Sequence, residues 1–513
     1  MNDEAAPKPV RPALAPPREA LLVALFVLTT AMLARSAWLT DDAQITFRTV
    51  LNWLHGYGPR FNVEERVQAY THPLWFLLLA AGTYAFDNVF VVAIVLASAC
   101  TLAVVGLVAT KVTRDLWAGA LAALALLVSK AFVDFATSGL ENPLLHLLLV
   151  LLVIVAARLE RRGSDSERIG VAFLAGLVYL VRADATLLVA PTVAVFAWGV
   201  RRRPKTLAAM ALAWALPVFA WTAFSLVYYG FPFPNTAYAK LGTGISGREK
   251  FVQGLRYVLD SFGRDALTLP LVTGALIVGP RRAPLDRALA LGIAAYLAFV
   301  VLVGGDFMSG RFFTAPFVLA IVLLARTEPR VPSLAVGAAV LCILGAANVR
   351  ATLWADRNFN ESGIGRDGIA DERGYYFHDF ALVNARRETY ADVSWEPTIR
   401  SVSVVCGLLG IKGVEGGPSL HLVDECGLAD PLLARLPATP NPNWRVGHFT
   451  RALPDGYHQS IEFRENAIRD PELARYYEAI RMVTRDPLFS RERFHAIAAL
   501  NLGHLKPPPP PKP

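Results

Sequence analysis

The stretch NVFVVAIVLASACTLAVVGLVAT, residues 88–110, contains no charged residue and is long enough to decide the class of fold. A helix needs about 20 apolar residues to cross roughly 30 Å of hydrocarbon. The whole chain shares this character, because 54% of its 513 residues are hydrophobic and only 18% are charged. Soluble proteins average about 45–50% apolar and about 25% charged residues. The sequence therefore predicts a polytopic membrane protein that is mainly α-helical.

Apolar runs on both sides of this stretch predict a bundle of about eleven membrane helices. The first run, residues 19–39, is too long for a signal peptide and leads into a polar segment, so we expect an uncleaved helix. The other candidates are residues 72–86, 88–110, 115–133, 141–157, 169–182, 186–200, 206–228, 266–280, 285–303, 311–325 and 331–349. Segment 72–86 has only 15 residues, and we expect it to be short, re-entrant or joined to its neighbour.

Basic residues cluster between the apolar runs and predict the orientation of the bundle, because short cytoplasmic loops carry an excess of Lys and Arg. The clusters are Lys111 and Arg114; Arg158, Arg161, Arg162 and Arg168; Arg201–Arg203 and Lys205; Arg281, Arg282 and Arg287; and Arg326 and Arg330. We expect these clusters in the cytoplasm, with the loops 39–71 and 229–265 and everything after residue 350 outside. The same pattern explains the net charge of +8 without nucleic acid.

Composition divides the chain into four parts. Residues 1–18 are rich in Pro and Ala and predict a disordered cytoplasmic tail. Residues 19–350 form the predicted membrane module. The apolar runs then stop, and residues 351–505 predict a small extracytoplasmic α/β domain. The end of the chain, 506–513, is a proline-rich tail.

The four cysteines exclude a disulfide scaffold. Cys406 and Cys426 lie in the predicted outer domain, where thiols oxidise, and either a disulfide or two free thiols fits their spacing. Cys100 and Cys342 lie in apolar runs and are interpreted as small buried hydrophobic residues.

Two adjacent acids, Asp41 and Asp42, come directly after the first apolar run. Taken alone, they are as typical of a solvated helix end as of a functional site. An amphipathic segment containing Ile45, Phe47 and Val50 follows them, and such a segment lies along a membrane surface. We therefore expect the acids at the height of the lipid headgroups, where a lipid-linked substrate presents its polar part.

Other ionisable residues fall on the same predicted face: Glu141, Arg182, Asp184, Asp306 and Arg311. Each alone is compatible with a solvated loop charge. Together they predict a polar cavity at the membrane boundary, because ionisable groups at this depth usually serve function.

The loop 229–265 adds further polar candidates. Asn235, Tyr238 and Lys240 follow two prolines, which prevent the preceding helix from continuing. One interpretation is that these residues are ordinary anchors at the membrane interface. The functional interpretation is that Lys240 or a neighbouring arginine binds an anionic phosphate. No GxGxxG or Walker sequence predicts a nucleotide site, and no HExxH or CxxC predicts a metal site.

The string DDAQITFRTVLNWLHGYGPRFNVEERVQAYTHPLW, residues 41–75, resembles the first-loop signature of the GT-C superfamily of membrane glycosyltransferases. Within it, the chain is most similar to the terminal arabinofuranosyltransferases of mycobacterial cell-wall arabinan, whose relatives decorate pilins. The resemblance continues through SGLE (138–141), RAD (182–184), FPNTAYAK (233–240), GGDFMSGRF (304–312) and GLLGIKGVEGGPSLHLVDECGLADPLLAR (407–435).

This resemblance implies a GT-C bundle in the bacterial cytoplasmic membrane that transfers a sugar, arabinofuranose above all, from a polyprenyl phosphate to an extracytoplasmic glycan or pilin-like protein. It implies that Asp41 is the base and that Asp42 orients the sugar or a cation. The remaining positions of the pattern are expected to bind substrate: Arg48, Glu65, Tyr70, Thr71, His72, Glu141, Arg182, Asp184, Asn235, Tyr238, Lys240, Asp306 and Arg311.

The departing phosphate must be neutralised by Arg, Lys or a divalent cation such as Mg²⁺ or Ca²⁺. The sequence predicts no metal ligands and no other cofactor.

Two other classes of function remain open from the sequence. A transporter or flippase of a lipid-linked sugar is also polytopic and charged, although it often shows repeated halves, which are absent here. A membrane protein whose outer domain binds cell-wall polymer without catalysis is the second alternative.

Overall fold

The computed structural model describes residues 18–327, 331–347, 364–365, 367–384 and 395–508. The predicted N-terminal tail lies outside these residues except for Arg18, which begins the first helix. The last five residues of the predicted proline tail, and the start of the predicted outer domain up to residue 363, also lie outside them.

Five helices are long and apolar enough to cross a membrane, which agrees with a mainly helical membrane protein. They are α1 (Arg18–Ser36), α4 (Val89–Leu107) with its π-helical continuation to Val112, α7 (Asn142–Arg162), α10 (Pro204–Tyr228) and α14 (Pro284–Val303). A sixth span is counted if α12 (Gly247–Arg264) and α13 (Thr268–Val278, with a 3₁₀ turn to Arg281) are taken together, although they meet at 111°.

The remaining helices of the bundle are too short to count as spans by length alone. They are α3 (Pro73–Phe86), α5 (Leu116–Val128), α8 (Asp165–Val181), α9 (Thr186–Gly199), α15 (Thr314–Ala325) and α16 (Val331–Ala347). Polar residues cut these runs: Ser129 ends α5 and caps the short α6 (Lys130–Asp134), and Arg182 ends α8 in an extended conformation. Length and composition in the described part of the chain therefore support five or six spans, and the count of about eleven stays a prediction.

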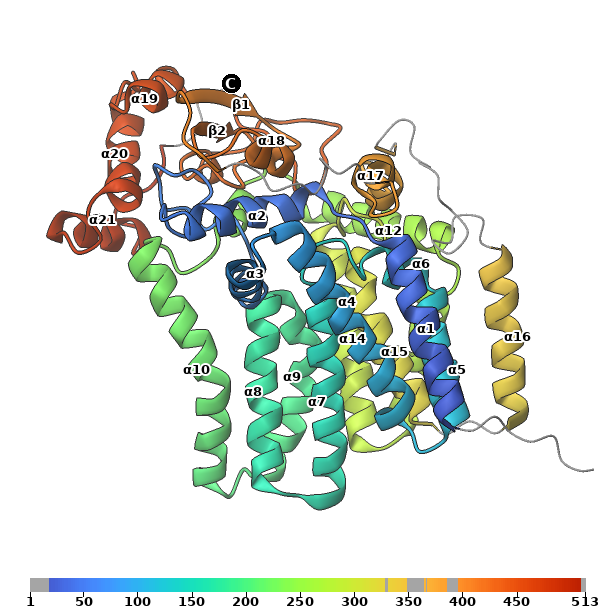
Figure 1. Ribbon diagram of the computed structural model, residues 1–513. Coiled ribbons are helices and arrows are strands. Elements are labelled where there is room, and N and C mark those ends of the chain that lie inside the picture. Colours follow the sequence, from blue (N-terminus) through green and yellow to red (C-terminus); the bar gives the residue numbers. More distant parts are fainter. Residues whose placement is uncertain (1–17, 328–330, 348–363, 366, 385–394, 509–513) are drawn as a thin grey trace, which may run out of the picture.

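Most of these short helices nevertheless run alongside the long ones (Figure 1). Helix α3 is the exception, since it is seen almost end-on while α4 and α8 are seen lengthwise. This orientation agrees with the expectation that segment 72–86 does not cross the membrane as a separate span. Pro73 begins α3, and Asp87 ends it in a left-handed conformation.

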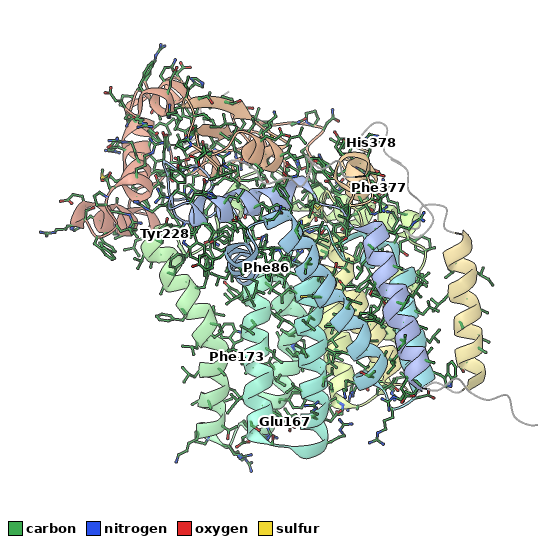
Figure 2. The ribbon with its side chains drawn as sticks, in the orientation of Figure 1. Phe86, Glu167, Phe173, Tyr228, Phe377 and His378 are labelled. Carbon is green, nitrogen blue, oxygen red and sulfur yellow. A yellow bond between two sulfur atoms is a disulfide. The ribbon has the colours of Figure 1, made fainter. Side chains whose placement is uncertain are left out.

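Two helices lie across one end of the bundle. Helix α2 (Asp41–Leu54) is the amphipathic segment predicted after the acid pair, and Figure 1 shows it lying over the ends of the bundle helices. Helix α12 lies at the same end. Figure 2 marks the two ends of the molecule, with Glu167 at the far end of α8 and His378 on α17 at the end that carries α2.

The C-terminal segment covers the end of the bundle that carries α2 (Figure 1). Its elements are α17 (Glu372–Phe380), β1 (Ser401–Val405), α18 (Leu409–Glu415), β2 (Leu420–Asp424), η5 (Leu433–Arg435), α19 (Tyr457–Phe463), α20 (Pro471–Arg485) and α21 (Arg491–Asn501). The two strands pair in parallel with Ser401 opposite Leu420, and α18 is the crossover between them. Cys406 and Cys426 form a disulfide between the residues that follow the two strands.

Helix α18 packs directly on α2. Glycines permit the approach: a Cβ at Gly410 would lie 2.0 Å from the carbonyl oxygen of Asp41, and one at Gly413 would lie 2.9 Å from Cδ of Arg48. Such distances leave no room for any other residue. The contact joins the first loop of the chain to a segment far along the sequence.

Candidate functional site

A cavity of about 650 Å³ lies between the end of the bundle and the C-terminal segment. Its walls come from α2, the loop before α3, the helix ends around residues 141 and 183, the loop after α10, the turn after α14 and the segments 407–428 and 446–449. It is lined by most of the predicted site residues: Asp41, Asp42, Tyr70, Thr71, His72, Glu141, Arg182, Asp184, Lys240, Asp306 and Arg311. The fold thus brings together residues from Asp41 to Arg311, which are separated by 270 positions of sequence.

The two acids begin α2 but differ in their surroundings. Asp41 is buried, and its Oδ1 accepts a hydrogen bond of 2.8 Å from the amide of Ile411 in α18. Burial raises the pKa of Asp41 to about 7 even though this amide favours the ionised form. The side chain of Asp42 is 30% exposed, and its Oδ2 lies 4.0 Å from Nη1 of Arg311. Burial also raises the pKa of Asp42, an effect that Arg311 opposes and Asp306 reinforces.

Arg311 is the centre of the charged network. Its guanidinium lies 3.2 Å from Glu141 and 3.7 Å from Asp306, in addition to its approach to Asp42. Glu141 is buried and is also approached by Nη1 of Arg182 at 3.4 Å. Burial alone would raise the pKa of Glu141, but Arg311, His72 and Arg182 lower it to about 2. Glu141 therefore stays ionised and holds both arginines at the cavity.

Arg182 is held more completely than Arg311. It donates to both carboxylate oxygens of Asp184, at 3.2 and 2.8 Å, and stacks over the ring of Phe312 at 4.6 Å. Tyr296 donates a further hydrogen bond of 3.0 Å to Asp184. These contacts fix the polar break between α8 and α9 and leave Arg311 as the arginine nearer to the acid pair.

Arg48 and Glu65 do not line the cavity. Arg48 is fully buried and donates to the carbonyl oxygens of Phe61 and Leu420, at 2.7 and 2.5 Å, and to that of Gly413. Glu65 is also buried, and its carboxylate lies 3.3 Å from Arg485 in α20. Both residues fasten the first loop to the C-terminal segment.

Asn235 and Tyr238 have the same kind of role in the next loop. They lie in the short helix α11 (Asn235–Ala239), and Asn235 donates hydrogen bonds of 2.9 Å to the carbonyl oxygens of Gly427 and Asp430. Tyr238 packs under the guanidinium of Arg435 at 4.3 Å. These contacts hold the loop after α10 against the C-terminal segment.

Two acids that the sequence did not single out also contribute to the site. Asp424, the last residue of β2, lines the cavity and accepts amide hydrogen bonds of 2.9 Å from Cys426 and Ala429. Glu372, the first residue of α17, pairs with Arg445 at 3.4 Å. Burial, reinforced by the charge of Asp42, raises the pKa of Glu372 to about 8. Asp424 lies within the resembling stretch 407–435, so that signal was available, whereas nothing in the sequence marks Glu372.

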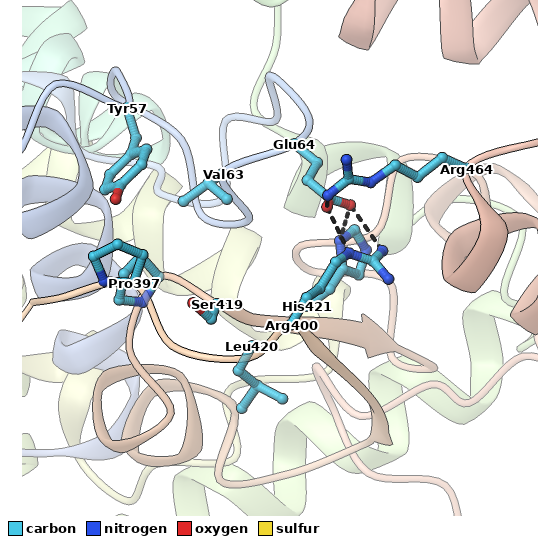
Figure 3. A pocket seen from close by; sticks show the side chains of 10 residues that line it. Tyr57, Val63, Glu64, Pro397, Arg400, Ser419, Leu420, His421 and Arg464 are labelled. Carbon is cyan, nitrogen blue, oxygen red and sulfur yellow. Dashed lines mark hydrogen bonds and ion pairs between the residues drawn. The ribbon is translucent and has the colours of Figure 1, made fainter.

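A second, smaller pocket of about 140 Å³ lies between the first loop and the C-terminal segment (Figure 3). Its charged groups satisfy one another: the carboxylate of Glu64 accepts from Arg400 at 2.7 and 3.0 Å and from Arg464 at 2.6 Å, and His421 lies 3.3 Å away. Because these charges are already paired, the pocket is interpreted as part of the contact between the first loop and the C-terminal segment, and not as a reactive site.

A divalent cation at the site stays a prediction. Mg²⁺ and Ca²⁺ need several oxygen ligands around one point. Within the described ranges, no group of three or more His, Cys, Asp or Glu side chains is arranged to hold a metal ion. The guanidinium of Arg311 lies 4.0 Å from Asp42.

No model of a known protein family matches the sequence. The fold is similar to that of ArnT from Cupriavidus metallidurans, with a TM-score of 0.50 and 14% identity over 80% of this chain and 86% of ArnT bound to undecaprenyl phosphate. The apo state of ArnT gives a TM-score of 0.52 at 13% identity. The GT-C fold expected from the sequence is thereby confirmed.

Two curated relatives carry the same name, terminal β-(1→2)-arabinofuranosyltransferase. The protein from Corynebacterium glutamicum is 27% identical over 86% of this chain and 80% of its own length. The protein from Mycobacterium tuberculosis is 30% identical over 82% of this chain and 81% of its own length. On this likeness the chain belongs to the family of terminal β-(1→2)-arabinofuranosyltransferases and is a membrane glycosyltransferase.

Proposed function

We propose that the protein transfers an arabinofuranosyl group from a polyprenyl phosphate to a cell-wall glycan on the extracytoplasmic side of the membrane. The observation that carries this proposal is the cavity, which joins the acid pair and Arg311 to an apolar wall at the membrane boundary. The names of the two relatives support the sugar, and the undecaprenyl phosphate bound to ArnT supports the class of donor. A transporter is not supported, since both relatives are transferases.

The apolar wall suits the prenyl chain of the donor. It is formed by Tyr179 and Leu180 of α8, Trp221 of α10, and Phe299 and Leu302 of α14. Burying a prenyl chain against such a surface contributes about 25 cal/mol for each Å² removed from water. A lipid lying there presents its phosphate towards the charged end of the cavity.

Arg311 and Lys240 are the proposed partners of the phosphate. Lys240 ends α11 and is exposed at the cavity, and its charge acts on Asp42. Arg311 has its guanidinium between the acids and Glu141. A phosphate that departs with increasing negative charge is stabilised by fixed cations already in place.

Asp42 is the proposed base. In the reaction, the acceptor hydroxyl attacks the anomeric carbon, the bond from this carbon to the phosphate oxygen breaks, and the hydroxyl proton passes to a carboxylate. The Asp42 side chain is partly open to the cavity, whereas Asp41 accepts from the amide of Ile411. We therefore exchange the roles implied by the family resemblance, with Asp42 as base and Asp41 as the residue that orients α2.

The proposed topology follows the distribution of basic residues. The last turns of α7 carry Arg158 and Arg161, and the connection from α9 to α10 carries Arg201–Arg203. These ends of the helices lie at the end of the bundle away from α2 (Figure 1). Positive loops remain in the cytoplasm. The cavity and the C-terminal segment then lie outside, and the shorter apolar helices complete a bundle of about eleven spans.

Purified protein with synthetic polyprenyl-phosphate arabinofuranose and an arabinan oligosaccharide tests this function. Asp42→Asn should lower the transfer rate by about 10²–10⁴-fold, as expected on loss of a base. Asp379→Asn, the same change at an exposed acid of α17, should leave the rate unchanged. If Asp42→Asn transfers sugar as fast as the unchanged protein, Asp42 is not the base. If another sugar is transferred faster, arabinofuranose is not the preferred sugar.

A further inference from the structure

Helix α12 carries an apolar stripe on its exposed side. Phe251, Leu255, Leu259 and Phe262 are all exposed and recur every three or four residues, with Val252 beside them, and Leu259 is 70% exposed. At this spacing the side chains form one face of a helix. A helix in water would turn such a face towards the protein.

The opposite side of α12 is polar or small and faces the protein. Gln253, Gly254, Tyr257 and Ser261 are buried. Gln253 donates a hydrogen bond of 2.7 Å to the carbonyl oxygen of Asp367, and Tyr257 donates one of 2.9 Å to that of Met308. The direction of the stripe is therefore fixed by specific contacts on the other side of the helix.

The depth of α12 is set by its contact with α14. A Cβ at Gly254 would lie 2.1 Å from the carbonyl oxygen of Val301, so the two backbones touch there. Val301 belongs to the last turn of α14, a helix long and apolar enough to cross the membrane. A helix that rests on the last turn of a membrane span lies at the boundary of the hydrocarbon.

The direction of α12 agrees with this depth. It joins α13 after the short break 265–267 and makes an angle of 111° with it, and Figure 1 shows α12 lying across the end of the bundle. Arg248 and Arg256 occur along the same helix, and basic residues favour the anionic surface of a membrane.

We propose that α12 lies in the plane of the membrane, with its apolar stripe among the lipid chains of the leaflet on the cavity side. Lys250, on the protein-facing side of the helix, lines the cavity. The helix therefore forms a wall between the leaflet and the cavity, and exposed Leu302 and Val303 of α14 continue this apolar surface. The proposed partner is the lipid itself, in contact with the helix along its length.

Fluorescence quenching in lipid nanodiscs tests the contact. A thiol-reactive bimane is attached to Leu259→Cys in the full chain, with Cys100 and Cys342 replaced by Ala and the disulfide kept. The nanodiscs contain a phospholipid with a nitroxide near the top of its acyl chain. Leu212→Cys on α10, where Leu212 is 65% exposed within a span, is the positive control, and Glu462→Cys on α19 is the negative control.

Leu259→Cys should lose fluorescence as strongly as Leu212→Cys, while Glu462→Cys should keep its fluorescence. Quenching at Leu259 no greater than at Glu462 would overturn the proposal and would mean that protein covers the stripe. Arg256→Cys, beside the stripe, gives a second position on the same helix and should be quenched less than Leu259→Cys. Because the measurement uses neither the sugar donor nor the sugar acceptor, it can fail or succeed independently of the proposed sugar transfer.

Discussion

Individual residues at the cavity divide into those open to a substrate and those that hold the open ones in place. Asp42, Arg311 and Lys240 belong to the first group. Asp41 and Glu141 belong to the second, since one accepts from α18 and the other holds two arginines. Sequence patterns identified these five residues but not this division, because the division depends on contacts between distant segments.

Lys240→Ala should weaken use of the lipid donor without unfolding the protein, because an exposed lysine contributes little to stability. Loss of a charged hydrogen bond to phosphate should raise the donor KM by about 10- to 100-fold. Steady-state kinetics with varied donor concentration measure the effect. Lys412→Ala, at an exposed position of α18 outside the cavity lining, is the control, and an unchanged KM for Lys240→Ala would leave Lys240 as an interfacial anchor.

The pH dependence of transfer should report on the charges around Asp42. Because the pKa of Asp42 is raised, its carboxylate ionises at a higher pH than an ordinary aspartate does. The transfer rate should therefore fall as the pH is lowered through this pKa. Arg445 favours the ionised form of Asp42, as do Arg311 and Lys240, while Asp306 opposes it. Arg445→Gln should therefore raise this pKa.

The expected result for Arg445→Gln is an acid limb of kcat/KM displaced to higher pH, with a smaller effect on the alkaline side. Arg475→Gln, the same change at an exposed arginine of α20, should leave the profile in place. A uniform loss of activity at every pH would show that Arg445 acts on the fold and not on the ionisation of Asp42.

At the scale of elements, apolar runs predicted most helices but not where they break. Ser129 interrupts the run 115–133, which composition reads as continuous, and its hydrogen bonds with Asp265 and Thr268 compensate for the break. The break at Arg182 was predicted, because 169–182 and 186–200 are separate apolar runs. Helix α12 was interpreted as loop, although the spacing of its apolar residues is helical.

Polar residues near the acid pair were assigned to substrate for a similar reason. Arg48 lies six positions after Asp42, but its partner Gly413 is separated from it by 365 residues. No local pattern reveals such a distant partner. In the sequence, a buried residue that holds two segments together therefore looks the same as a residue that binds a ligand. Asn235, which bonds Gly427, is the same case in the second loop.

Arg48→Met should therefore destabilise the contact between α2 and α18. It removes the donor from the carbonyl oxygens of Gly413 and Leu420, at a cost of about 1–3 kcal/mol each, while that of Phe61 still accepts from Asn52 at 2.9 Å. Thermal unfolding in detergent should show the loss, while the fraction that remains folded should keep the donor KM. Arg464→Met, at a largely exposed ion pair, should change stability by only about 0–1 kcal/mol, and a raised KM for Arg48→Met would restore a role in binding.

At the scale of the whole molecule, the proposed topology puts the C-terminal segment outside the cell. Glu462→Cys on α19 should react with a membrane-impermeant maleimide in intact cells, in a chain whose Cys100 and Cys342 are replaced by Ala. Ser166→Cys, exposed at the far end of α8, should react only after the membrane is permeabilised. The reverse pattern would place the cavity in the cytoplasm and would contradict the orientation drawn from the basic clusters.

The contact between Asp41 and the amide of Ile411 also has a consequence in time. The two residues are separated by 370 positions, so at a synthesis rate of about 5–20 residues per second the ribosome needs on the order of 20–70 s to make the second after the first. During this interval the nascent chain contains its early helices but lacks segments 407–428 and 446–449, which form one wall of the cavity. Asp41 therefore lacks this partner for the whole interval, and chains truncated before Ile411 would carry the acid pair without the contact that holds it.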